Sequence, residues 1–195
     1  PDGITIANER IYTADTDGMN WPSQSTRVSV VDINSFEFEK TITVSLNPNY
    51  IYSDSDGDVY VICMSDYSDD KSYIVQRIDA KTDEVKTVEG IKAYKMTVAD
   101  DIAYIMFNDY YANEVKYYKY DLKNEKLLSD NFITDGTVVS SPNGIGVDPV
   151  TGDIYVGKSN KKNNGDVYVF SSEGKLKSQF ETLPYPADFV FMTNK

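Results

Sequence analysis

A strand centred on a tyrosine recurs four times along the chain at a nearly constant interval. The tyrosines are Tyr12, Tyr60, Tyr104 and Tyr155, separated by 48, 44 and 51 residues, and each follows a turn. A strand-like run precedes each tyrosine strand, and a hairpin-like pair of alternating runs follows it. Each repeat thus supplies four strands in about 45 residues, which is typical of the blades of a β-propeller.

The turn inside each hairpin-like pair begins at a short polar residue. Asp32, Asp79 and Asp121 occupy this place in three repeats, and Ser171 replaces them in the fourth. Because an Asp side chain accepts hydrogen bonds from the backbone of a following turn, the pattern predicts Asx turns. We therefore interpret these carboxylates as structural residues.

The strand count predicts an all-β protein with one partial propeller domain over residues 1–195. The four blades are expected at approximately 1–47, 48–92, 93–141 and 142–185. A fifth copy of the innermost strand, at 186–192, is expected to be a closing strand. Since a closing strand usually joins strands from the opposite end of the chain, we expect the chain to be the C-terminal part of a larger propeller, with about three further blades missing. The missing part would come from the same precursor or from a second chain.

Two stretches carry a family resemblance. They contain the runs Val28-Ser29-Val30-Val31-Asp32, Lys40-Thr41-Ile42-Thr43-Val44 and Pro142-Asn143-Gly144-Ile145-Gly146-Val147. The pattern resembles YncE-like seven-bladed propellers, and more closely the DUF5074 or "surface layer protein" group of Bacteroides-type lipoproteins. Some members of this group resemble surface lipoproteins that capture cobalamin over an outer-membrane transporter. The resemblance implies that the chain is the C-terminal four blades of a seven-bladed propeller. It also implies an exported protein, in the periplasm or on the outer-membrane surface, and an outer-membrane transporter as a partner.

Charge and composition limit the classes of function. The formal net charge is −12, so nucleic acid and anionic membrane surfaces are not expected as partners. The sequence contains no His, which removes the usual general base near neutral pH and the commonest metal ligand. Cys63 is the single cysteine and lies in an apolar run, so it is expected to be buried. We predict no cofactor and no enzymatic activity.

The long polar loops between second and third strands, and those joining blades, are the expected binding face. Within the loops at 15–26, 65–72, 108–114 and 158–165, aromatic rings could hold a bulky small molecule or glycan while amides and a cation bind its polar groups. The predicted ligand-binding residues are Trp21, Tyr67, Asn108, Tyr110, Tyr111, Asn160 and Lys161. The alternative is that these rings pack over neighbouring loops and hold them in place.

The acidic run Asp54-Ser55-Asp56-Gly57-Asp58 suggests a calcium loop, but Ser65 stands where an EF-hand loop requires Glu. We therefore prefer a plain turn there. The leading hypothesis is capture of a bulky nutrient, either cobalamin-like or a glycan. The alternative, a platform for protein–protein interaction, is favoured if the loop aromatics form a flat exposed patch instead of lining a concavity. A lyase or lactonase is the weakest hypothesis.

Overall fold

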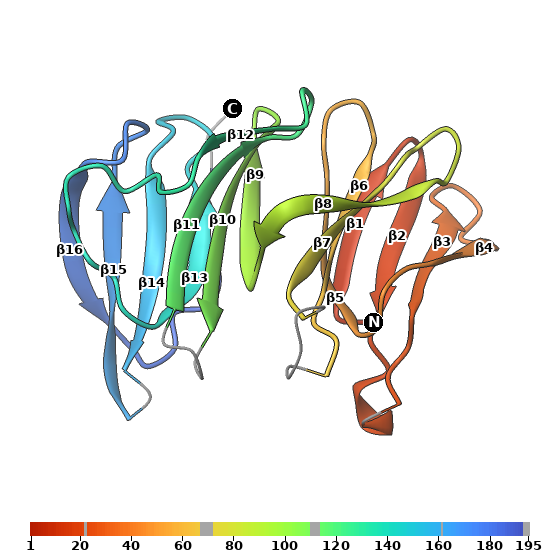
Figure 1. Ribbon diagram of the computed structural model, residues 1–195, viewed down its shortest axis with the longest axis horizontal. Coiled ribbons are helices and arrows are strands. Elements are labelled where there is room, and N and C mark those ends of the chain that lie inside the picture. Colours follow the sequence, from red (N-terminus) through yellow and green to blue (C-terminus); the bar gives the residue numbers. More distant parts are fainter. Residues whose placement is uncertain (22, 67–71, 110–113, 161, 193–195) are drawn as a thin grey trace. The chain divides into compact units, whose positions relative to one another are not determined.

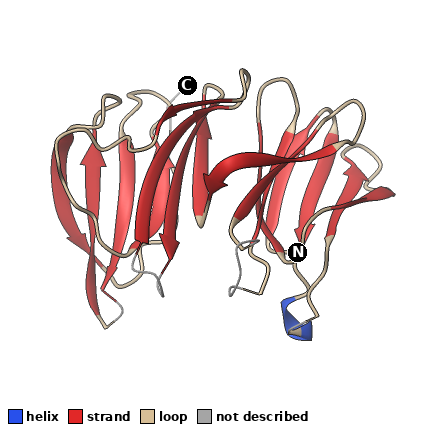
Figure 2. Cartoon of the chain, viewed as in Figure 1, coloured by secondary structure: helices blue, strands red, loops and turns tan. Residues whose placement is uncertain are grey.

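The structure is a computed structural model of the chain, and it describes residues 1–21, 23–66, 72–109, 114–160 and 162–192. It is almost entirely β-structure, with four antiparallel sheets of four strands each (Figure 2). A single turn of 3₁₀ helix, η1 (Gly18–Asn20), stands between the second and third strands of the first sheet. The predicted all-β propeller fold is thereby confirmed.

In every sheet the strands pair in sequence order. The first sheet contains β1 (Gly3–Ala7), β2 (Arg10–Asp15), β3 (Arg27–Asp32) and β4 (Phe38–Thr43), and the second contains β5 (Pro48–Ser53), β6 (Val59–Cys63), β7 (Ile74–Ile78) and β8 (Val85–Lys92). The third contains β9 (Lys95–Ala99), β10 (Ile102–Asp109), β11 (Glu114–Asp121) and β12 (Lys126–Ser129), and the fourth contains β13 (Pro142–Val147), β14 (Ile154–Asn160), β15 (Asn163–Phe170) and β16 (Leu176–Thr182) (Figure 1). We call these sheets blades 1 to 4.

Two compact units divide the chain, residues 1–94 with blades 1 and 2 and residues 95–195 with blades 3 and 4. In the first unit β1 and β2 pack against β5, and in the second β9 and β10 pack against β13. Each unit thus has the face-to-face packing of successive propeller blades. The assignment of both units to one domain stays a prediction.

The second strand of each blade forms much of the core. Every residue of β6 is buried, and Ile154 and Val156 of β14 are fully enclosed. The repeated tyrosines all lie in second strands, and Tyr12, Tyr60 and Tyr104 are buried. Since a fully buried Val or Ile contributes about 1.5–3 kcal/mol, these central strands are a large part of the folding energy.

Blade 3 departs from the regular pattern at its outer strand. β12 has four residues and pairs with β11 only between Lys119 and Asp121. The chain then turns at Ser129–Asn131 and passes beside the β15–β16 turn, where the Thr134 N–H donates to the carbonyl of Gly174 at 2.9 Å. Figure 1 shows this connection, residues 130–141, running from β12 past the end of β15 to β13. The outer edge of β11 is therefore only half covered.

The expected closing strand at 186–192 is an extended segment with no strand pairing among the described residues. Contacts with side chains of blades 3 and 4 hold it in place instead. The ring of Phe191 packs edge-on against Tyr155 at 5.1 Å between centroids, and the buried ammonium of Lys95 donates to the carbonyl of Ala187 at 2.8 Å and to Asp188 at 2.5 Å. A strand requires a hydrogen-bonded neighbour, and no described strand pairs with this segment, although β13 and β14 pack against it. Because the predicted closing strand would pair with strands outside this chain, its pairing stays a prediction.

Replacing Gly157 by Ala is expected to displace segment 186–192. An added Cβ would lie 2.4 Å from the carbonyl oxygen of Pro186, and overpacking of this kind costs about 1–3 kcal/mol. Hydrogen exchange should become faster at 187–192 and the melting temperature should fall. Gly18→Ala is the matched control, since its Cβ would have no neighbour nearer than 3.7 Å. Unchanged exchange in Gly157→Ala would contradict the observed packing.

Candidate functional site

In each unit the β-strand order places all loops between second and third strands at one end of the sheets. We call this end the loop face of that unit. The connection that leads from one blade into the next reaches the first strand at the same end. The predicted ligand-binding residues all belong to these loops or to the strand ends beside them.

The first unit presents an apolar tip on its loop face. The turn at η1 is closed by the Asn20 N–H donating to the Asp17 carbonyl at 3.0 Å, and by the Asn20 amide donating to the Asp17 carboxylate at 2.8 Å. This turn leaves Met19 98% exposed and Trp21 55% exposed. Exposed large apolar side chains that lie together on one turn are candidates for contact with another molecule.

The base of the same loop is fixed by buried hydrogen bonds. The Thr16 hydroxyl donates to the carbonyl of Pro48 at 2.6 Å, which joins the loop to the first strand of blade 2. The Ser25 carbonyl accepts from the Asn47 N–H at 2.8 Å, and the Ser25 N–H donates to the Thr16 carbonyl at 3.0 Å. The exposed tip therefore stands on an ordered base, which favours binding because little conformational entropy is lost there.

The other predicted ligand-binding residues divide into two groups. Asn108 is the penultimate residue of β10, and its amide donates to the carbonyl of Pro142 at 3.2 Å, so it ties blade 3 to blade 4. Tyr67, Tyr110, Tyr111 and Lys161 lie outside the described residues, and Asn160 is described only as the last residue of β14. Their proposed contact with a ligand stays a prediction.

A groove in the second unit was not predicted from the sequence. It consists of two adjoining depressions of about 260 and 340 Å³ beside the half-covered edge of β11. We call it the blade-3 groove. Its lining comes from residues 115–117 of β11 and from Asp130, Asn131, Ile133 and 137–140 of the following connection. The length of that connection is the sequence feature that could have indicated the groove, since 12 residues separate β12 from β13, against four between β4 and β5.

The floor of the groove is built by Tyr117. Its hydroxyl donates to the buried carbonyl of Val139 at 2.6 Å, and its ring packs edge-on against Phe132, with 5.4 Å between centroids. Phe132 in turn packs edge-on against Tyr104 of the neighbouring strand. Burial raises the pKa of the Tyr117 hydroxyl, so it stays a neutral donor near neutral pH. The connection is thus fastened over the blade 3 core.

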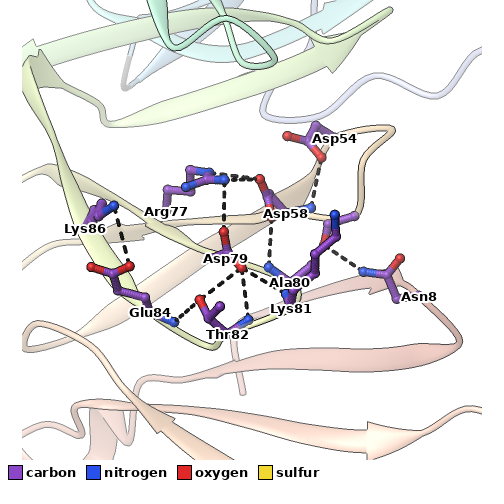
Figure 3. A network of polar contacts seen from close by, with 11 residues as sticks. Asn8, Asp54, Asp58, Arg77, Asp79, Ala80, Lys81, Thr82, Glu84 and Lys86 are labelled. Atoms are coloured by element: carbon purple, nitrogen blue, oxygen red, sulfur yellow. Dashed lines mark hydrogen bonds and ion pairs between the residues drawn. The ribbon is translucent and has the colours of Figure 1, made fainter.

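The acidic run at 54–58 is part of a structural network (Figure 3). The Asp54 carboxylate accepts from the Asp58 N–H at 2.9 Å, which closes a turn. The Asp58 carboxylate accepts from the Arg77 guanidinium and, at 2.8 Å, from the Ala80 N–H. These contacts use the carboxylates that a calcium ion would need, and no group of three potential metal ligands occurs among the described residues. A plain turn, as preferred above, agrees with this geometry.

The predicted Asx turns are present. The Asp79 carboxylate accepts from the N–H groups of Thr82 at 2.9 Å and Lys81 at 3.0 Å, and those bonds lower its pKa (Figure 3). Backbone N–H donors of Ser35 and Asn34 lower the pKa of Asp32 in the same way. Asn124 lowers the pKa of Asp121 through its side chain and its N–H. The carboxylate oxygens of these three Asp residues thus accept hydrogen bonds within turns, as the sequence predicted.

The single cysteine of the sequence is buried. Cys63 is fully enclosed, and burial raises the pKa of its thiol to about 12. A thiol of this kind is a poor nucleophile at neutral pH. No helix in the described part of the chain is both long enough and apolar enough to cross a membrane.

No family model matches the chain, and no curated protein matches it. Solved structures do match. The chain is similar to a propeller titled "Structure of Dos1 propeller", with 12% identity, a TM-score of 0.66 and coverage of 96% of this chain. It is also similar to Kuenenia stuttgartiensis hydrazine synthase (13% identity, TM-score 0.65, 88% coverage) and to a chain of a mitotic checkpoint complex (10%, 0.63, 92%). At these identities the likeness shows the fold alone.

The chain spans about half the length of these structures. It covers 48% of the Dos1 chain, 51% of the hydrazine synthase chain and 49% of the checkpoint chain. The comparisons thus support a propeller architecture and leave its ligands to be inferred from this chain's own residues.

Replacing Tyr117 by Phe is expected to destabilise the second unit by about 1–2 kcal/mol, because the buried Val139 carbonyl loses its donor. Urea unfolding measures the loss. Tyr118→Phe is the matched control, since Tyr118 is the adjacent, half-buried tyrosine, and it should change stability by less than about 0.5 kcal/mol. Equal effects of the two changes would show that the hydroxyl bond is unimportant.

Asp79→Ala is expected to lower the melting temperature at pH 7, with the difference from the wild type shrinking in acid. The pKa of Asp79 is lowered in the folded state, so its stabilisation is complete above the unfolded value of about 3.9 and is lost as the pH falls through the folded value. Melting curves from pH 7 to pH 2.5 measure this. Asp79→Asn keeps an acceptor oxygen and serves as the control. A difference that is constant over this range would refute the assignment.

Proposed function

We propose that this chain is a non-enzymatic binding propeller and that its loop faces recognise a protein partner. The observation that carries the proposal is the apolar tip formed by Met19 and Trp21 on an ordered base. Aromatic residues and Met are enriched in the cores of protein interfaces, where they are fully buried on binding. A projecting tip suits insertion into a partner's surface better than enclosure of a small molecule.

The size of the blade-3 groove supports the same choice. Small-molecule pockets usually have volumes of about 300–1,000 Å³ and enclose most of the ligand. The larger depression, at about 340 Å³, is at the small end of this range, and it is open at the surface. A corrin or a glycan chain would contact it only in part, whereas a side chain of a protein partner would fill it.

Capture of a bulky nutrient is the second candidate. It is favoured by the resemblance to the YncE-like and DUF5074 group and by the apolar side chains that line the groove, Val115, Ile133, Val138 and Val139. Under this proposal the ligand is cobalamin-like or a glycan, and the loop aromatics enclose it. The exported location, in the periplasm or at the outer-membrane surface, and the transporter partner belong to both candidates.

A further strand is proposed as a partner of segment 186–192. Phe189 and Phe191 face blade 4, while Val190 and Met192 are almost fully exposed on the opposite side. Such alternation of covered and exposed side chains is typical of a β-strand. Strands from the same precursor or from a second chain would cover the exposed side.

The proposal predicts that binders selected against this chain depend on the apolar tip. Binders are selected from a phage-displayed library of small protein domains, and their affinities are measured by biolayer interferometry. The double change Met19→Ser and Trp21→Ser should weaken most of them by about tenfold or more, because hot-spot side chains contribute about 2 kcal/mol or more each. Val150→Ser is the control, at an exposed valine (73%) on the β13–β14 turn, away from the loop face.

Binders that tolerate the double change would exclude the apolar tip as the recognition site. A parallel melting series with cyanocobalamin, haem and neutral glycans tests the second candidate, since a ligand at 100 times its Kd stabilises by about 2.7 kcal/mol. A clear rise in melting temperature with one of them would replace the protein partner by nutrient capture.

A further inference from the structure

The open edge of blade 3 has backbone groups directed outward. In an antiparallel strand, alternate residues direct their N–H and C=O to the same side. The Tyr117 carbonyl accepts from the Phe132 N–H on the outer edge of β11, at 2.8 Å. Val115, two residues earlier, therefore directs its N–H and C=O to the same edge, where no described strand pairs with it.

The blade-3 groove occupies the place of the missing outer strand. β12 ends at Ser129, and the isolated parallel bridge between Tyr117 and Asn131 marks the point where the chain turns away. From Tyr117 toward the start of β11, the groove lies between this strand and residues 137–140 of the connection. A backbone edge on one side and apolar side chains on the other are the features of sites that bind an extended peptide.

The walls of the groove favour an apolar anchor residue. Val138 is 82% exposed and Val115 is half-buried, both on its rim, while Ile133 and Val139 are buried beneath it. Because Val138 is so exposed, a ligand that covers it removes much apolar surface from water, which favours binding. The volume of about 340 Å³ is enough for one or two aliphatic side chains.

Charge favours a basic peptide. The exposed carboxylate of Asp130 lines the groove, and the single lysine of its lining, Lys116, is paired with Glu114 at 3.3 Å. The chain as a whole has a net charge of −12, which attracts cations toward this edge.

We propose that the blade-3 groove binds an extended peptide of a partner protein, with an aliphatic side chain in the groove, a Lys or Arg beside Asp130, and backbone hydrogen bonds to Val115. The peptide completes the outer edge of blade 3. The inference rests on the proposed function and names the chemistry of the partner.

The probe is a fluorescent ten-residue peptide in which Ile alternates with Lys, titrated against the full chain and followed by anisotropy. The same peptide N-methylated at alternate amides is the matched control, because it keeps side chains and charge but loses the donors for an edge strand. We expect the N-methylated peptide to bind about tenfold more weakly. Equal affinities would overturn the backbone part of the proposal.

Two variants test the protein side. Val115→Pro removes the outward N–H and leaves the pairing with β10 intact, since Pro is tolerated on edge strands. It should weaken the unmodified peptide about fivefold and leave the N-methylated one unchanged. Val138→Ser should weaken both peptides several-fold, whereas Val150→Ser, at an equally exposed valine outside the groove, should have no effect.

The outcomes separate this inference from the proposed function. Binding that is lost on raising the salt concentration but unaffected by Val115→Pro and Val138→Ser would show non-specific attraction and overturn the groove. Peptide binding that disappears with Met19→Ser and Trp21→Ser but tolerates Val138→Ser would also overturn it, while the loop-face proposal stands. Sedimentation velocity of the unliganded chain is the last test, because a dimer abolished by Val138→Ser would show that a second copy, not a peptide, occupies the groove.

Discussion

Burial of one strand between its neighbours is the constraint on which this structure depends. β6 has no exposed residue, because β5 and β7 flank it and its Val59, Val61 and Cys63 pack in one core cluster with residues of blade 1. In a sheet whose central strand is buried in this way, the turns and loops at the strand ends remain exposed. The turns and loops at those ends then vary without cost to the core, which explains why an Asx turn closes the hairpins at one end and long loops occupy the other.

Much of this arrangement could be predicted because it follows from local periodicity. Alternation marks a strand with one buried face, and the interval between Tyr12, Tyr60 and Tyr104 marks the repeating sheet. The Asx turns followed from the chemistry of one carboxylate beside several N–H groups. The absence of described pairing at 186–192 could not be predicted in this way, because alternation within a segment does not show whether a partner strand lies beside it.

The candidate site was predictable to a smaller degree. Trp21 was identified as a loop aromatic, and its exposure agrees with a role at a surface patch. Asn108 was also identified, but its amide holds the start of blade 4 through Pro142, a contact distant in sequence that no motif reveals. The blade-3 groove depends on the early end of β12, where the Ser129 hydroxyl donates to the Asn131 carbonyl and accepts from the Asn131 N–H. Such a deviation is visible only against the regular blades.

The two candidate recognition features are physically different, and the difference matters for how a partner would bind. The tip at Met19 and Trp21 offers area without backbone donors, so it contributes affinity that depends little on the partner's orientation. The groove beside Val115 offers few atoms but a directional backbone edge, so it fixes register and direction. A partner that engaged only the tip would bind with loose geometry, and one that engaged only the groove would gain little area. The two features therefore call for different partner chemistry, an apolar surface for the tip and an extended basic segment for the groove.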